Sequence, residues 1–291
     1  MMTLAEWRKQ QAASRPDWIK VRISNGKNYQ ELREIMRGQS LHTVCEEAQC
    51  PNIGECWENR TATFMILGKV CTRACRFCAV TTGRPDGLDQ EEPERVAEAV
   101  DRMSLRHVVV TSVARDDLPD GGAGIFAETI RAIRRRQGDA KIEVLIPDFA
   151  GSDDALQKVM KAGPDVLNHN LETVERLQSK VRAKARYARS LRVLERAKEL
   201  APDGIVKSGI MLGVGEEWAE IVATMGDLRG VNCDVMTIGQ YMRPSPSHLP
   251  IARYYKPAEF DQLRDIGKSM GFRHVESGPL VRSSYHAHEH V

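Results

Sequence analysis

Residues 61–78, TATFMILGKVCTRACRFC, join a short apolar run to a loop that contains three cysteines. The run over residues 61–67 is apolar and partly β-branched, which is typical of a strand buried on both faces. Cys71, Cys75 and Cys78 follow it with the spacing Cys-x3-Cys-x2-Cys. Thiolates are soft ligands that suit iron, and three in one loop can act together. The stretch therefore predicts a strand followed by a metal-binding loop.

Similar apolar runs recur along the chain, and amphipathic helical patterns separate them. The further runs cover residues 107–112, 141–147, 165–170, 205–212 and 233–240. Six strand–helix repeats without a linker predict an α/β fold, a partial (β/α)6 barrel with fewer than the usual eight units. A flat doubly wound sheet is the alternative. Functional sites of such barrels lie at the carboxyl ends of the strands, where the cysteine loop is expected.

The flanking segments predict three parts. Residues 1–60 are polar and interrupted by Pro and Gly, so we expect an N-terminal extension. Residues 61–270 form the predicted barrel. Residues 271–291 are expected to be a C-terminal extension, and both extensions are expected to cover the barrel mouth.

Composition excludes few functions but favours a globular protein. The chain has 291 residues, 42% of them hydrophobic, and its formal net charge of +2 gives no reason to expect nucleic acid or membrane as a partner. No apolar run approaches the roughly 18 residues of a membrane helix, and the N-terminus lacks a secretory pattern. We therefore expect the cytoplasm, where cysteines more often bind metal than form disulfides.

Six of the seven cysteines lie between positions 45 and 78, in two groups of three. The first group is Cys45-x4-Cys50-x5-Cys56. Three protein ligands on a four-iron cluster leave one iron open for a substrate or cofactor. The pattern predicts two clusters, at least one of them reactive. A structural zinc site that borrows a distant histidine is the alternative for the second group.

The loop of Cys71, Cys75 and Cys78 after a first barrel strand resembles the radical S-adenosylmethionine (SAM) superfamily. The first triplet, within HTVCEEAQCPNIGECW (residues 42–57), narrows the resemblance to the lipoyl synthase family, whose ending RSSYHA (residues 282–287) matches. The resemblance covers residues 15–287. It implies a 4Fe–4S cluster on the second triplet, which binds SAM and yields a 5′-deoxyadenosyl radical.

The same resemblance implies an auxiliary 4Fe–4S cluster held by Cys45, Cys50, Cys56 and a serine, Ser283, with Ser284 as the alternative. The implied reaction inserts two sulfur atoms, at C6 and C8 of a protein-bound octanoyl-lysine, with two SAM molecules and sulfur from the auxiliary cluster. Other sulfur-inserting radical enzymes, a two-cluster electron carrier and a zinc-stabilised binding module are the rival interpretations.

The implied partners are octanoylated carrier domains, namely the acyltransferase subunit of 2-oxoacid dehydrogenases and the glycine cleavage H protein. Reduced ferredoxin or flavodoxin and an iron–sulfur carrier are also implied. The basic segment 179–190 is interpreted as a solvated approach to a helix, or else as a docking site for an acidic carrier domain. Cys233 is expected to be a buried thiol.

Polar and apolar residues after each strand are candidates for binding SAM. Hydrogen bonds are expected from Thr111 and Ser112, and an ion pair with the SAM carboxylate from Arg115. The other candidates are Phe77 beside the cofactor, Asn170 and Glu172 at ribose or amine, Met211 at adenine, and Gln240, Tyr241 and Arg243 at cofactor or substrate.

Overall fold

The structure is a computed structural model that describes residues 6–7, 15–19, 26–39, 41–47, 50–58 and 61–289. Its main sheet has eight strands in the order β1-β2-β5-β6-β7-β8-β9-β10. Their bounds are β1 His42–Thr43, β2 Thr63–Ile66, β5 His107–Ser112, β6 Lys141–Leu145, β7 Val166–Asn168, β8 Ile205–Leu212, β9 Val235–Gln240 and β10 His274–Gly278. All neighbours from β2 to β10 are parallel, and β1 is antiparallel to β2.

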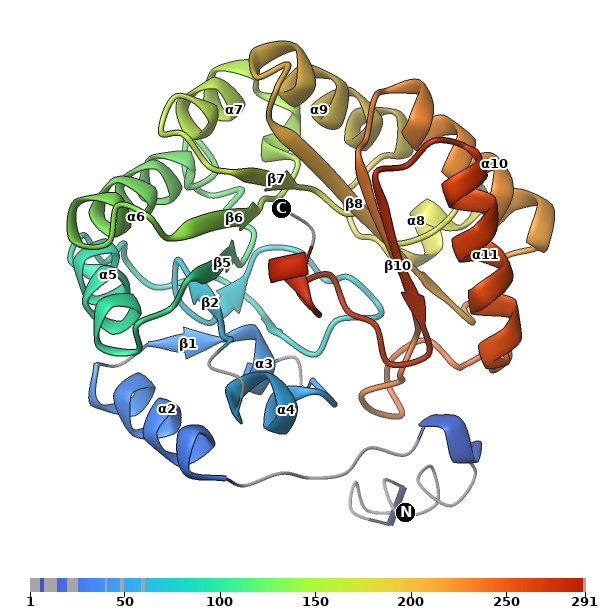
Figure 1. Ribbon diagram of the computed structural model, residues 1–291, viewed down its shortest axis with the longest axis horizontal. Coiled ribbons are helices and arrows are strands. Elements are labelled where there is room, and N and C mark those ends of the chain that lie inside the picture. Colours follow the sequence, from blue (N-terminus) through green and yellow to red (C-terminus); the bar gives the residue numbers. More distant parts are fainter. Residues whose placement is uncertain are drawn as a thin grey trace.

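The strand order distinguishes between the two expected architectures. From β2 to β10 the strands follow one another in chain order, so every crossover advances in the same direction. A doubly wound sheet would reverse its order at a switch point. Among the described residues no pairing joins β10 back to β1, and Figure 1 shows the strands curving around a central space with helices outside. The expected partial barrel is confirmed, and its barrel is open.

The helices follow the strands as the amphipathic patterns predict. Those that cover the outside are α5 Glu92–Arg102, α6 Ala123–Arg136, α7 Asp153–Met160, α9 Tyr187–Leu200, α10 Trp218–Gly230 and α11 Pro257–Ser269. Short elements between them are β3 Val70–Cys71, β4 Thr81–Thr82, η2 Phe149–Gly151, η3 Glu175–Leu177 and α8 Gln178–Val181. Their buried apolar faces join the strands in one core. Among the described residues no helix is long and apolar enough to cross a membrane.

Two strands of the main sheet are additions to the six expected ones. β10 extends the barrel into residues assigned to the C-terminal extension, and it alternates buried and half-buried positions. Such an edge strand gives a weaker apolar signal than a strand covered on both faces. β1 lies in the N-terminal extension, together with η1 Asp17–Ile19, α2 Lys27–Gly38, α3 Val44–Glu47 and α4 Ile53–Glu58. The division at residues 60 and 270 itself stays a prediction.

A buried ion pair fills the barrel below its mouth. Lys207 of β8 and Glu143 of β6 are both fully buried, with Lys207 Nζ 2.9 Å from Glu143 Oε1. Gly209 of β8 and Leu145 of β6 lie two positions nearer the carboxyl ends of these strands and therefore on the same strand faces. Both line the cavity described below. Asn168 of β7 donates a further hydrogen bond of 2.9 Å to Glu143. The barrel interior is therefore closed beneath the site.

Candidate functional site

A cavity of about 710 Å³ opens at the carboxyl ends of the strands. It brings together nearly all the candidate residues: Cys45, Cys50, Cys71, Cys75, Phe77, Cys78, Thr111, Ser112, Asn170, Glu172, Met211, Gln240, Tyr241, Arg243, Ser283 and Ser284. Of the candidates, Cys56 and Arg115 do not line it. The lining also includes Trp7 and Arg15 of the N-terminal part and Val281 of the C-terminal part. Both extensions thus contribute to the wall of the barrel mouth, as expected.

The second cysteine triplet lies in the loop after β2. Cys71 ends the short strand β3, and its Sγ accepts hydrogen bonds from the main-chain N–H groups of Arg73 at 3.4 Å and Ala114 at 3.3 Å. Burial, together with the neighbouring thiols Cys75 and Cys71, raises the pKa of Cys78 to about 12. Thiolates that disfavour one another in this way suit a shared cationic centre, which would relieve their repulsion. This donor set fits an iron–sulfur cluster facing the cavity.

The first triplet lies where the N-terminal and C-terminal parts meet. Cys45 is in α3 and Cys56 is in α4. Burial raises the pKa of both to about 12, and the neighbouring thiols Cys45 and Cys50 add to the shift. All three cysteines line a small cavity of about 20 Å³ together with Arg282, Ser284 and Tyr285. Because Cys45 and Cys50 also line the large cavity, the two triplets flank the same space.

The two candidate serines have different surroundings. Ser283 Oγ accepts a hydrogen bond of 2.6 Å from Asn170 Nδ2, at the carboxyl end of β7. Ser284 Oγ accepts one of 2.9 Å from Thr63 Oγ1 and alone of the two lines the small cavity of the first triplet. Both line the large cavity. The assignment of Ser283 as the cluster ligand, with Ser284 as the alternative, stays a prediction.

Several of the residues expected to bind SAM have polar groups at the cavity that are free to bind a ligand. Ser112 Oγ and Asn170 Oδ1 are buried and have no hydrogen-bond partner among the described residues. Glu172 is half-buried, partial removal from water raises the pKa of its carboxyl, and it accepts a hydrogen bond of 3.1 Å from Asn170 Nδ2. Thr111 is different, because its hydroxyl already donates to Leu145 O at 2.9 Å. Ser112, Asn170 and Glu172 are therefore the candidates best placed to bind a polar cofactor.

Other candidates hold the loop that follows β9. Gln240 Nε2 donates to the carbonyl of Leu212 at 3.0 Å, and Tyr241 Oη donates to the carbonyl of Leu249 at 2.9 Å. Arg243 donates to the carbonyl of His248 at 3.0 Å, and its guanidinium lies 5.7 Å from the centre of the Trp7 ring. Their polar groups are largely engaged in this loop. Their expected role in orienting cofactor or substrate stays a prediction.

Arg115 occupies a different position from the expected one. Its Nη2 lies 2.8 Å from Asp117 Oδ2 and also donates to the carbonyl of Asp86 at 3.3 Å. The guanidinium is buried against these partners, outside the cavity lining. The expected ion pair between Arg115 and the SAM carboxylate is not supported by this geometry.

Sequence reasoning missed five basic residues that line the cavity: Arg15, Arg73, His169, Arg182 and Arg282. Burial lowers the pKa of Arg182, which lies near Glu172 and Cys75. The basic segment that contains it is therefore only partly solvated. His169, within the 165–170 run, is buried with its ring nitrogens 2.8 Å from Ile146 O and 2.9 Å from Ser190 Oγ. A charged residue in a cysteine loop was the only available signal for Arg73.

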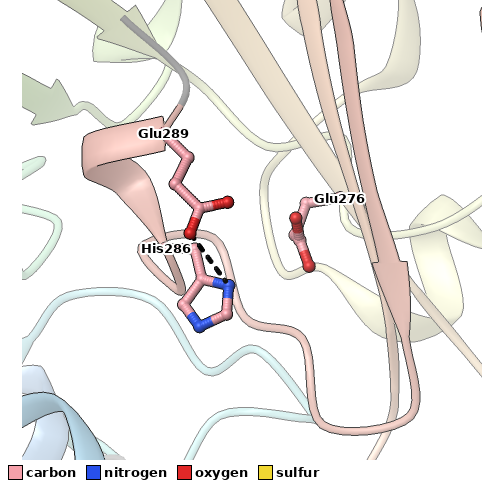
Figure 2. A group of neighbouring side chains, drawn as sticks. All are labelled: Glu276, His286 and Glu289. Carbon is pink, nitrogen blue, oxygen red and sulfur yellow. Dashed lines mark ion pairs between the residues drawn. The ribbon is translucent and has the colours of Figure 1, made fainter.

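A further group of ionisable side chains holds the end of the chain. Figure 2 shows Glu276 of β10 beside His286 and Glu289, whose carboxylate lies 3.8 Å from His286 Nδ1. The ligand atoms of the three lie within 4.8 Å of one another. Tyr285 Oη, next to His286, lies 3.2 Å from Glu55 Oε1 of α4. The contact with Glu55 holds the segment that follows Ser283 and Ser284 against α4, and the same segment lies beside Glu276 of the barrel.

Comparison with known families agrees with this geometry. Residues 65–228 match the model of the radical SAM superfamily, and residues 4–50 match that of the N-terminal domain of lipoyl synthase of the radical SAM family. The lipoyl synthase of Rubrobacter xylanophilus is 64% identical, covering 94% of this chain and 86% of that protein. The lipoyl synthase of Halalkalibacterium halodurans is 58% identical, and the match covers 98% of this chain and 94% of that protein.

Solved structures of low sequence identity share the fold. Methylornithine synthase superposes with a TM-score of 0.55 at 14% identity, covering 91% of this chain and 73% of that one. Streptococcus suis SuiB, crystallised with S-adenosylmethionine, gives a TM-score of 0.55 at 12% identity, covering 75% and 49%. At such identities the likeness concerns the fold alone.

Proposed function

This chain belongs to the lipoyl synthase family of the radical SAM superfamily, and we propose that its two cysteine triplets divide the labour of that reaction. The reaction inserts two sulfur atoms, at C6 and C8 of a protein-bound octanoyl-lysine, and the enzyme uses two 4Fe–4S clusters and S-adenosylmethionine. The resemblance seen in the sequence is thereby confirmed. The proposal concerns which cysteines and which serine hold each cluster.

One observation carries the assignment: both triplets contribute to the wall of a single cavity. Cys71, Cys75 and Cys78 would hold the SAM-binding cluster, because their loop stands at the carboxyl ends of the strands and faces the polar groups of Ser112 and Asn170. Cys45, Cys50 and Cys56 would hold the auxiliary cluster, with Ser283 as the fourth ligand. A serine oxygen is a harder and weaker partner for iron than a thiolate, so it could be given up.

When bound at these sites, the two clusters would supply the electron that cleaves the SAM sulfonium and the sulfide that enters the product. The chain itself supplies position and exclusion of water. The apolar side chains of Met65, Phe77 and Met211 line the cavity between the polar groups, which suits an acyl chain. Saturated C–H bonds offer side chains no acidity to exploit, so holding the octanoyl carbon beside the reactive centre is the main contribution of the barrel.

The enzyme acts on octanoylated carrier proteins and needs a reductant. We propose the acyltransferase subunit of 2-oxoacid dehydrogenases and the glycine cleavage H protein as carriers, and reduced ferredoxin or flavodoxin as electron donor. Lys180, Lys184 and Arg186 are exposed around the buried Arg182 and could attract an acidic carrier domain. Rebuilding of the auxiliary cluster by an iron–sulfur carrier, and a cytoplasmic location, remain predictions.

The decisive experiment is anaerobic reconstitution followed by a single-turnover assay. Iron and sulfide are counted, and then dithionite, SAM and an octanoyl-lysyl peptide are added. About eight irons per chain, release of 5′-deoxyadenosine and a peptide that gains two sulfurs would support the assignment. Binding of only about four irons after full reconstitution would overturn the two-cluster assignment. Iron binding without SAM cleavage would indicate an electron carrier instead.

Serine-to-alanine variants separate the two candidate ligands. Ser283→Ala should leave SAM cleavage largely intact and impair sulfur insertion, whereas Ser284→Ala should impair insertion less. The reverse order would make Ser284 the ligand, which would agree with its place in the small cavity. Equal loss of cleavage and insertion in Ser283→Ala would argue against a dedicated auxiliary role.

A further inference from the structure

One buried arginine connects the second cysteine loop to two neighbouring strands. Arg73 lies between Cys71 and Cys75, and its side chain is only 7% exposed. Its Nη2 lies 2.6 Å from Asp116 Oδ1 and 2.7 Å from Asp148 Oδ1. Its Nε lies 2.9 Å from Asp116 Oδ2, so the contact with Asp116 has two prongs. A planar guanidinium held in this way is fixed in orientation as well as in place.

The two aspartates extend from successive strands of the barrel. Asp116 follows β5 and Asp148 follows β6, so Arg73 joins the loop after β2 to the loops after the next two strands of the sheet. Asp148 is fully buried, and its second oxygen lies 3.1 Å from Arg189 Nη1. Lys184 lies 3.6 Å from Asp116 but is 63% exposed, so it adds little. Arg73 is the one cation in contact with both carboxylates among the described residues.

The same segments meet at the sulfur of Cys71. The N–H groups of Arg73 and Ala114 both donate to Cys71 Sγ. Between them, Thr72 donates two hydrogen bonds of 3.0 Å to the carbonyl oxygen of Ala114, one from its main-chain N–H and one from its hydroxyl. Donors to a thiolate sulfur stabilise its negative charge, and they raise the reduction potential of a cluster that it holds. Their distances depend on how the loop after β2 sits on the loop after β5. Arg73 and Asp116 fix that relation.

We propose that Arg73, Asp116 and Asp148 form a clamp that positions Cys71 and sets the strength of its two N–H···S hydrogen bonds. Arg73 is a positioning residue in this proposal, since it acts through the loop and not on the substrate. The proposal rests on the proposed function only in taking Cys71 as a cluster ligand. The clamp itself is built from the chain alone, and it can be tested without a cluster.

Arg76 provides the matched control. It lies in the same loop with the same charge, but it is exposed and takes no part in the clamp. In the cluster-free protein, Arg73→Met should make alkylation of Cys71 by iodoacetamide, followed by peptide mass spectrometry, several-fold faster, because the freed loop exposes the sulfur to the reagent and this outweighs the loss of the N–H donors to the thiolate. Arg76→Met should leave the rate unchanged. Arg73→Lys, which keeps the charge but loses the two-pronged contact, should give an intermediate rate.

The reconstituted protein gives a second readout. Loss of the clamp weakens the N–H···S bonds, so Arg73→Met should shift the potential of the SAM-binding cluster to more negative values. A spectroscopic titration would then show a smaller reduced fraction at a fixed poise, and Arg76→Met should stay close to the wild type. If Arg73→Met and Arg76→Met behave alike in alkylation and potential, the clamp does not position Cys71.

A double variant separates positioning from stability. Arg73→Met leaves the buried Asp148 with a single cation, which should lower the melting temperature. Arg73→Met/Asp148→Asn removes that unbalanced charge and should recover stability, whereas alkylation of Cys71 should stay fast and the potential low. If stability, the alkylation rate of Cys71 and the cluster potential all returned to wild-type values, the role of Arg73 would be structural and the proposal would be overturned. If the wild type binds no cluster at Cys71, the proposed function fails, but the alkylation comparison still decides on the clamp.

Discussion

The amide Nδ2 of Asn170 lies 2.6 Å from the hydroxyl Oγ of Ser283, although 113 positions separate the two residues. Asn170 stands at the carboxyl end of β7, in the middle of the sheet, and Ser283 belongs to the segment after β10. The same amide donates to Glu172 at 3.1 Å. One side chain thus joins the polar groups expected to bind SAM to the segment expected to complete the auxiliary site.

Asn170→Ala should loosen the C-terminal segment in the cluster-free protein. Loss of one hydrogen bond costs about 1 kcal/mol, which corresponds to roughly fivefold faster opening. Tryptic cleavage after Arg282, followed by mass spectrometry, measures this opening. Ser283→Ala removes the other half of the same bond, so the double variant should be no faster than either single variant. Additive effects would show that Asn170 and Ser283 act separately.

Gly239→Ala should displace the same segment from another direction. A β-carbon at Gly239 of β9 would lie 2.1 Å from the main-chain oxygen of Val281, and main chain cannot give way cheaply. We expect a loss of about 1–3 kcal/mol in the free energy of unfolding, by urea titration. Sulfur insertion should fall more than SAM cleavage. Gly226→Ala in α10 is the control, because no described atom outside the helix's own backbone lies within 4 Å of the added β-carbon, and it should be neutral or slightly stabilising.

His169 should make stability depend on pH in the mildly acidic range. Burial, aided by the charge of Arg182, lowers the pKa of His169 to about 4 from the usual 6.5. The unfolded chain therefore takes up a proton at a higher pH than the folded chain does, and the stability present above pH 6.5 is lost as the pH falls towards 4. The loss should reach about 2 kcal/mol by pH 5.

Urea titrations of wild type and His169→Gln at pH 7 and pH 5 would measure this effect. The neutral ring fits its surroundings, because Nδ1–H can donate to Ile146 O while Nε2 accepts from the hydroxyl of Ser190. His169→Gln should lower stability at pH 7 and show a smaller further loss at pH 5. An identical pH dependence in both proteins would contradict the assigned shift.

Lys207→Met should be strongly destabilising, although Lys207 does not line the cavity. The substitution leaves the fully buried Glu143 without its ammonium partner, which costs about 3–5 kcal/mol. A urea titration of the cluster-free protein would measure it. Lys207→Met/Glu143→Gln removes both charges and should recover most of the loss. If the double variant were as unstable as the single one, packing and not charge would explain the effect.

The barrel itself could be predicted because its signals are local. Each of the six apolar runs, such as 107–112 and 205–212, became a parallel strand, since a strand buried on both faces must be apolar along its length. The sequence did not predict β10, because an edge strand is covered less completely and its residues alternate between buried and half-buried positions. The order of the strands, which excludes the doubly wound sheet, was visible only in the pairing.

At the site, the sequence determined the residue types that carry chemistry and their family. Two triplets with fixed spacings identify thiol ligands, because ligands to one cluster must lie close together and short loops keep them so. The tertiary structure decided how these residues are used. It turned Arg115 towards Asp117 and outside the cavity, it gave Ser283 and Ser284 different partners, and it placed Arg73 between two aspartates. Such contacts join residues far apart in the chain, and their geometry follows from the packing of the whole barrel, which no local pattern encodes.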